Sequence, residues 1–217
     1  MKNLFNPEGV FVQFLSRVGD LILLNVLFLA CCLPVVTIGA STAALHKVTQ
    51  DYILDNDTGV FKPFFRAFAA NFKQATVVWL VQLFVIVGLG ADFLLITAYF
   101  TGTLATVMYT LLIVLMVLVA CVSAYMTPLL VRYENTLRQH LSNAVVLAII
   151  KLPKTVGMVV LNLLPLLIAL LSLNVFLQTM VFWISIGFAF VAFLQSNLLK
   201  SVFGELEQGN ESVTVFK

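Results

Sequence analysis

Four long apolar stretches constrain the fold of this chain more than any other feature. They lie at about residues 75–95, 111–131, 155–173 and 180–199. A helix rises 1.5 Å per residue, so about 20 apolar residues are needed to cross about 30 Å of hydrocarbon. Each stretch meets this requirement. The sequence therefore predicts an all-α, polytopic helical membrane protein.

The overall composition supports the same fold class. Of the 217 residues, 61% are hydrophobic and only 10% are charged. Soluble domains average about 45–50% apolar and about 25% charged residues. The excess is too large for one buried core. This composition excludes a disordered chain, a secreted disulfide scaffold and a nucleic-acid binder, and it makes the lipid bilayer the expected environment.

A fifth apolar region, residues 15–45, is interrupted by Pro34. Proline breaks or kinks a helix, so the region either crosses the membrane once or turns back at this point. A return gives six segments, with residues 15–33 crossing and residues 35–52 forming a short or re-entrant helix. A single crossing gives five. We favour the return, because small residues such as Gly39, Ala40, Ala43 and Ala44 would allow close helix packing.

The placement of the 12 Lys and Arg residues predicts the orientation. The connections near residues 99–110 and 172–178 contain none of them, and the loops at the other ends of the spans do. Cationic loops stay in the cytoplasm. We therefore expect one transmembrane domain over residues 1–203 and a polar cytoplasmic tail over residues 204–217. The return at Pro34 would also place Lys2 and Arg17 inside, whereas a single crossing would leave them outside.

Two further segments have the pattern of cytoplasmic amphipathic helices. The first carries a phenylalanine stripe, with basic residues at other angles of the helix; the stripe consists of Phe61, Phe64, Phe65, Phe68 and Phe72. Such a helix either lies in the membrane interface or packs beneath the spans of its own chain. The second segment places Leu137, Leu141, Val145 and Ala148 on one face and ends before Pro153.

The sequence contains no pattern that indicates catalysis. An HExxH zinc motif, a GxxxxGK[ST] nucleotide loop and a GxSxG nucleophile elbow are all missing, so we expect no enzyme activity, no metal and no cofactor. Polar residues inside membrane segments are costly and are candidate functional sites. The candidates here are Asp20, Asn25, Gln82, Asn162 and Gln195. Asp20 could instead pair with Arg17, and buried amides more often join helices than bind substrates.

Two blocks of sequence resemble a known family. Residues 19–45, which include CLPVVTIGASTAAL, and residues 64–76, FFRAFAANFKQAT, are similar to the signature of the YesL family. That family consists of bacterial cell-membrane proteins with a domain of unknown function, often encoded beside sugar ABC transporters. The resemblance implies a multi-pass protein of the bacterial cytoplasmic membrane. It supplies no catalytic or binding residues.

A second resemblance concerns one cytoplasmic loop. The coupling helix of sugar ABC permeases has the form EAA-x3-G-x9-I-x-L-P, and Glu134, Ile150, Leu152 and Pro153 match its spacing, whereas His140 replaces its glycine. Glu134, Pro153 and the phenylalanine stripe are therefore the candidate partner-docking residues. We expect a non-enzymatic accessory or regulatory component of carbohydrate ABC-type uptake. The alternatives are a small autonomous transporter or channel and a membrane scaffold. The oligomeric state stays open.

Overall fold

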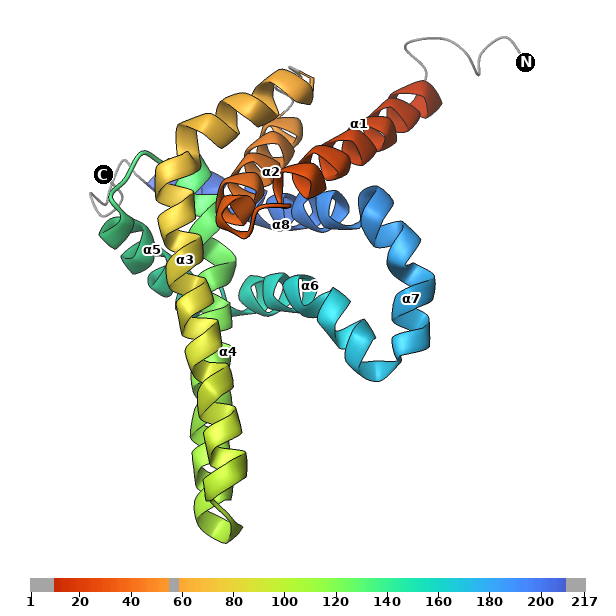
Figure 1. The fold of residues 1–217 in the computed structure, drawn as a ribbon. Helices are drawn as coiled ribbons and strands as arrows, with labels where there is room; N and C mark the ends of the chain where they lie inside the picture. The colour runs from red at the N-terminus through yellow and green to blue at the C-terminus, as the bar shows by residue number, and fades with distance from the viewer. Residues whose placement is uncertain (1–9, 55–58, 210–217) are drawn as a thin grey trace.

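The computed structural model describes residues 10–54 and 59–209, and these residues contain helices and no strands. Figure 1 shows their arrangement. In chain order the elements are α1 (Val10–Cys31), a 3-10 turn (Val35–Thr37), α2 (Ile38–Ile53), α3 (Phe61–Tyr99), α4 (Gly102–Arg132), α5 (Leu137–Ile150), α6 (Leu152–Leu171), α7 (Leu173–Phe182), a π-helix (Trp183–Gly187) and α8 (Phe188–Gly209).

The predicted helical membrane architecture is confirmed. Within the described residues, four helical stretches are long and apolar enough to cross a membrane, namely α3, α4, α6 and the combined stretch Leu173–Glu205. The two predicted N-terminal segments are α1, with 22 residues, and α2, with 16 residues. At 1.5 Å per residue α2 extends over only about 24 Å, so it is too short for a full crossing.

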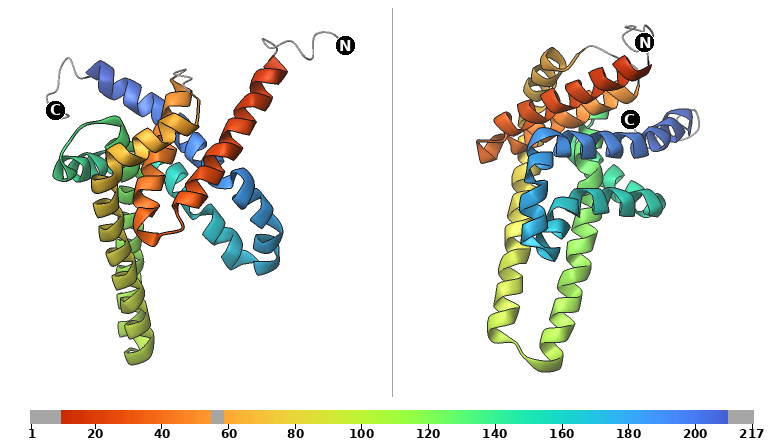
Figure 2. Two further views of the ribbon diagram at one scale, coloured as in Figure 1. Left: turned by 45° about the horizontal axis from the view of Figure 1, so that its top comes forward. Right: turned by 90° about the vertical axis from the view of Figure 1, so that its right-hand side faces the viewer.

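The chain turns back between α1 and α2, at the position of Pro34 (Figure 2). The Thr37 hydroxyl lies 2.6 Å from the Cys31 carbonyl oxygen and 2.7 Å from that of Pro34. The Trp79 indole on α3 donates a hydrogen bond to the Val35 carbonyl, at 2.9 Å. The Cys31 carbonyl is one that the end of α1 leaves without a helical partner, and the other two carbonyls belong to the connection between α1 and α2.

Small residues bring α2 close to α3. Ala40, Ala43 and Ala44 are fully buried, as expected for close packing. At Gly39 a Cβ atom would stand 2.3 Å from the Ala75 carbonyl oxygen, which is too close for any side chain. The two helices can therefore approach this closely only with glycine at position 39.

The phenylalanine stripe does not form a separate helix. It occupies the first turns of α3, which continues without a break to Tyr99. Residues 69–76 contain neither proline nor glycine, so nothing in this stretch ends the helix. Figure 1 shows the ribbon of α3 changing direction after these first turns and then running down along α4. The expected amphipathic helix and the expected span are thus one element.

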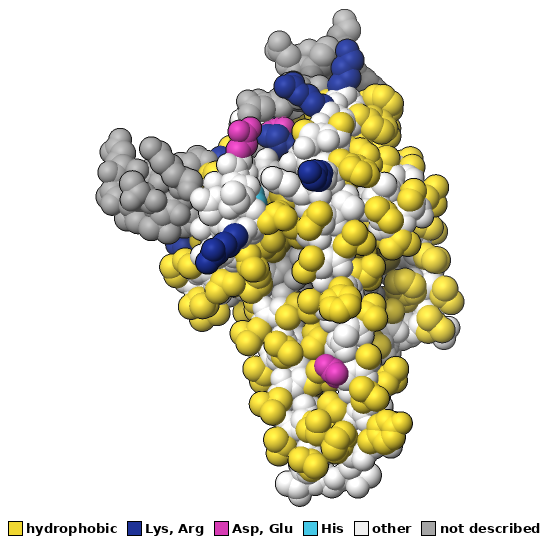
Figure 3. Space-filling model, turned by 60° about the vertical axis from the view of Figure 1, so that its left-hand side comes forward, with side chains coloured by type: hydrophobic (Ala, Val, Ile, Leu, Met, Phe, Trp, Pro, Cys, Tyr) yellow, Lys and Arg dark blue, Asp and Glu magenta, His cyan; other side chains and the backbone are white. Residues whose placement is uncertain are grey.

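Helices α3 and α4 form a long hairpin, joined by Phe100 and Thr101, whose far half extends beyond the other helices (Figures 1 and 2). Residues 74–131 contain no Lys or Arg. In the view of Figure 3 the cationic side chains lie toward the upper end of the molecule, and the lower end is covered by hydrophobic side chains.

The C-terminal helices are longer than expected. The predicted span at residues 180–199 is part of the stretch Leu173–Glu205, which starts directly after the α6–α7 turn at Ser172. Helix α8 continues to Gly209, so the first residues of the predicted polar tail are helical. The rest of that tail, residues 210–217, lies outside the described residues, as does the N-terminal segment 1–9.

Candidate functional site

A large cavity lies between α2, α3, α4 and α6. Its volume is about 700 Å³, and most of its lining is apolar. This size falls within the range of about 300–1,000 Å³ that is typical of small-molecule sites. Polar side chains reach it from all four helices: Thr42, His46, Gln82, Ser123, Thr127 and Asn162.

Several polar groups at the cavity lack hydrogen-bond partners in the described part of the chain. Gln82 makes no hydrogen bond with the described residues, and His46 is buried with its Nδ1 atom unpaired. Pro128 has no N–H group, so the Ala124 carbonyl on the preceding turn of α4 lacks its usual helical donor. Both residues line the cavity. The cavity therefore presents donors and acceptors that a bound molecule could use.

A second amide, Asn162, faces the same cavity but is partly engaged. The Gln195 amide donates a hydrogen bond to the Asn162 side-chain oxygen, at 2.8 Å, and approaches the Met158 carbonyl at 3.4 Å. Gln195 is buried on α8, so this network joins α6 to α8. Of these two predicted polar residues, Gln195 has a structural role and Asn162 contributes to both the network and the cavity.

Asn25 binds the π-helix between α7 and α8. Its side-chain amide donates to the Trp183 carbonyl at 3.1 Å and to the Ile184 carbonyl at 2.7 Å, and its oxygen accepts from the Ala189 N–H at 3.0 Å. A π-helix shifts hydrogen bonds to i→i+5 and disturbs the regular ladder. Asn25 supplies hydrogen-bond partners to backbone groups at this point. Asp20 lies earlier in α1, five residues before Asn25, where it is half-buried and has an interaction partner.

The phenylalanine stripe divides between two environments. Phe64 is fully buried, and Phe68 packs beside it in a core formed by α1, α2, α3 and α8. Phe61, Phe65 and Phe72 are exposed on the outside of α3. Lys62, Arg66 and Lys73 follow these exposed rings one by one in the sequence, and they are exposed as well. Part of the stripe thus packs under the spans, and the other part faces outward.

The segment that resembles the permease coupling helix, residues 134–153, contains the regular helix α5. Glu134 is exposed in the α4–α5 connection, and Pro153 stands in the first turn of α6. Thr136 and Gln139 form a capping box at the start of α5. His140, at the position of the permease glycine, is fully buried inside α5, and burial lowers the pKa of its imidazole. The turn that the glycine makes in permeases is therefore not present here.

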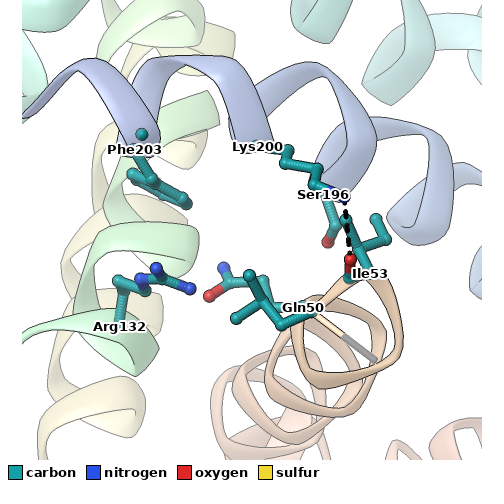
Figure 4. A pocket seen from close by; sticks show the side chains of 8 residues that line it. Gln50, Ile53, Arg132, Ser196, Lys200 and Phe203 are labelled. Atoms are coloured by element: carbon teal, nitrogen blue, oxygen red, sulfur yellow. Dashed lines mark hydrogen bonds between the residues drawn. The ribbon is translucent and has the colours of Figure 1, made fainter. Parts of the chain in front are cut away.

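A smaller pocket of about 180 Å³ lies where α2, α4 and α8 meet (Figure 4). Lys200 donates a hydrogen bond to the Ile53 carbonyl, at 3.2 Å, and so binds the carboxyl end of α2. The Arg132 guanidinium lies 5.2 Å from the centre of the Phe203 ring, a cation–π contact. The Gln50 amide donates to the Pro128 carbonyl at 3.1 Å. These contacts make the pocket a junction between three helices.

The structure thus brings together only some of the predicted residues. Gln82 and Asn162 share the large cavity, whereas Asp20, Asn25, Glu134 and Pro153 do not line it. Sequence patterns did not indicate His46, Ser123 or Thr127 as site residues. Ser123 and Thr127 are four residues apart on α4, a spacing that places them on one helix face and could have indicated a polar lining.

Among the described residues, no cluster of three or more His, Cys, Asp or Glu side chains could hold a metal ion. No curated protein and no solved structure matches this chain. Residues 21–93, which include part of α1, all of α2 and most of α3, match the model of a family described as a protein of unknown function, DUF624.

Proposed function

We propose that this membrane protein is a non-enzymatic accessory or regulatory subunit of a carbohydrate uptake system of the ABC type. Its partners would be the membrane subunits of a sugar ABC transporter. The resemblance of residues 19–45 and 64–76 to the YesL family suggests this kind of partner. The structure contributes a surface suited to binding another membrane helix.

That surface is the far half of the α3/α4 hairpin. Its internal contacts are made by Leu89, Ile96, Ala105 and Leu112, which belong to the hairpin itself. Gly88 and Gly90 lie here on α3, and a Cβ atom at either position would meet nothing within 4 Å. The packing of the described residues therefore gives no reason for glycine at these positions.

Two glycines that the packing within the chain does not require lower the stability of a helix. Each glycine disfavours a helix by about 1 kcal/mol relative to alanine. In membranes, small residues allow two helix backbones to approach closely, and this packing drives association where lipid removes the hydrophobic effect. Gly88 and Gly90 thus fit a role in contact with a helix outside this chain. This is the observation that carries the proposal.

The test is co-purification of the full chain from its native membrane in a mild detergent. We expect ABC permease subunits in the eluate. Replacing Gly88 and Gly90 together by Leu should strongly reduce their recovery, because the added side chains hold the partner helix away. The chain itself should stay folded, since a Cβ atom at either position meets nothing within 4 Å.

Val87→Leu is the matched control, because Val87 is an exposed apolar neighbour of Gly88. It should leave partner recovery unchanged. Recovery of permease subunits that is equal for the glycine variant and the wild type would show that the hairpin is not the docking surface. An eluate containing only copies of this chain would contradict the accessory role and favour the autonomous transporter or channel.

A further inference from the structure

The lining of the large cavity changes from polar to apolar along its length. On α3 the polar residue Gln82 lies nearer to the cationic end of the helix, marked by Lys73, than Ile86 and Leu89 do. Gln82 and Leu89 are seven residues apart, which corresponds to about 10 Å along the helix. Beyond Gln82 the α3 wall is thus wholly apolar, and the half nearer Lys73 combines Gln82 with Ala75, Val78 and Trp79. We call these the apolar and the polar half of the cavity.

The α4 and α6 walls have the same polarity gradient. On α4, Ser123 and Thr127 lie toward the Arg132 end, and Met116 and Val117 lie farther from it. On α6, Asn162 precedes Leu166, which is farther from the basic start of that helix. On three separate helices, the part of the lining farthest from the basic end therefore has no polar side chain among the described residues.

The polar half can form hydrogen bonds with a ligand, but it is not suited to a charged one. None of the described residues that line the cavity is Lys, Arg, Asp or Glu, so a phosphate or carboxylate would find no counter-ion among them. The buried His46 has an Nδ1 atom without a hydrogen-bond partner, and Gln82 forms no hydrogen bond within residues 10–54 and 59–209. Unpaired polar groups in hydrocarbon are costly, which favours a ligand that pairs with them.

We propose that this cavity binds one uncharged amphipathic lipid of the monoacylglycerol type from the surrounding membrane. Its hydroxyl and ester groups bond with Gln82, Asn162 and His46 at the polar half. Its acyl chain lies along Ile86, Leu89 and Met116 at the apolar half. A cavity of about 700 Å³ has room for such a molecule. This binding does not depend on the proposed accessory role.

The experiment uses the full-length protein in phosphatidylcholine nanodiscs and a photoreactive monoacylglycerol as the probe. We expect labelled peptides from the cavity walls of α3, α4 and α6. Unlabelled monoolein should compete for this labelling. Lysophosphatidylglycerol, which has a charged head, and maltose, which has no apolar chain, should not compete.

Two variants test the two halves of the cavity. Gln82→Leu should weaken monoolein competition by about fivefold, as expected for the loss of one hydrogen bond to a neutral group. Ala120→Trp should abolish specific labelling, because Ala120 lines the cavity and the indole would fill it. Leu111→Trp is the control, since Leu111 is an exposed residue on α4 outside the cavity. It should leave labelling unchanged.

Three results would overturn the proposal. Equal competition by lysophosphatidylglycerol would show that the head group need not be neutral. Labelling that resists excess monoolein would show only bulk lipid contact. Unchanged binding in both Gln82→Leu and a folded Ala120→Trp would place the lipid elsewhere. If Ala120→Trp does not fold, Gln82→Leu and the competition series still decide the outcome.

Discussion

At the scale of single residues, the buried amides of this chain divide by their partners. Asn25 and Gln195 form hydrogen bonds with backbone and side-chain groups, whereas Gln82 forms none with the residues that the structure describes. All three look alike in the sequence, as one amide within an apolar stretch. Only the neighbouring helices decide whether such an amide joins helices or lines a cavity.

Asn25→Leu should destabilise the protein by about 1–3 kcal/mol. The variant keeps the side-chain volume but leaves the Ala189 N–H and two π-helix carbonyls without the bonds that Asn25 supplies. Thermal unfolding in detergent, followed by tryptophan fluorescence, would measure the loss. Val26→Leu, at an exposed neighbouring position, should unfold like the wild type. An Asn25→Leu variant as stable as the wild type would show that water or lipid replaces these bonds.

At the scale of helices, sequence patterns predicted the apolar spans well, but they predicted poorly where the helices begin and how they pack together. The apolar stretch at residues 111–131 lies in α4, and all but the last two residues of the stretch 155–173 lie in α6, because the length of an apolar run is a local property. The extension of α3 back to Phe61 is also local, but the charged residues among its phenylalanines suggested a separate helix. The cavity could not be predicted, because Gln82 and Asn162 meet only through tertiary packing.

Gly39→Ala should push α2 away from α3. The new Cβ atom would stand 2.6 Å from the Trp79 Cβ atom and closer still to the Ala75 carbonyl. Overpacking of this kind costs about 1–3 kcal/mol. The unfolding temperature in detergent would show the effect.

Gly19→Ala is the matched control for that substitution. Gly19 lies in α1, and a Cβ atom there would meet nothing within 4 Å. Because alanine favours a helix by about 1 kcal/mol over glycine, this variant should be equal to or more stable than the wild type. If both variants behave alike, the close α2–α3 contact does not limit stability.

At the scale of the whole molecule, the basic residues meet at one end. Lys200 binds the end of α2, and Arg132 stacks on Phe203 of α8. Lys151, at the start of α6, forms an ion pair with Glu205. These contacts join the ends of α2, α4, α6 and α8, and the Phe100–Thr101 turn lies at the far end of the hairpin (Figure 1). We expect the joined end in the cytoplasm.

Cysteine labelling in intact cells would test this orientation. In a background with Cys31, Cys32 and Cys121 replaced by alanine, an impermeant maleimide should modify cysteines introduced at Thr101 and Asn174. It should not modify Glu134→Cys. Labelling of Glu134→Cys from outside would reverse the predicted orientation. A cysteine at Asn3, which lies outside the described residues, would show whether the N-terminus is also inside.

The contact between Asn25 and the π-helix also constrains how the protein is made. Asn25 leaves the ribosome early, but its partners Trp183, Ile184 and Ala189 are synthesised more than 150 residues later, the separation being 158 residues for Trp183. Until these residues are synthesised, the Asn25 amide lies in the membrane without these hydrogen bonds. Helix α1 can therefore bind the π-helix and α8 only at the end of biosynthesis. A chain that stops before the π-helix would leave Asn25 on α1 without all three bonds, and we expect quality-control proteases to degrade it.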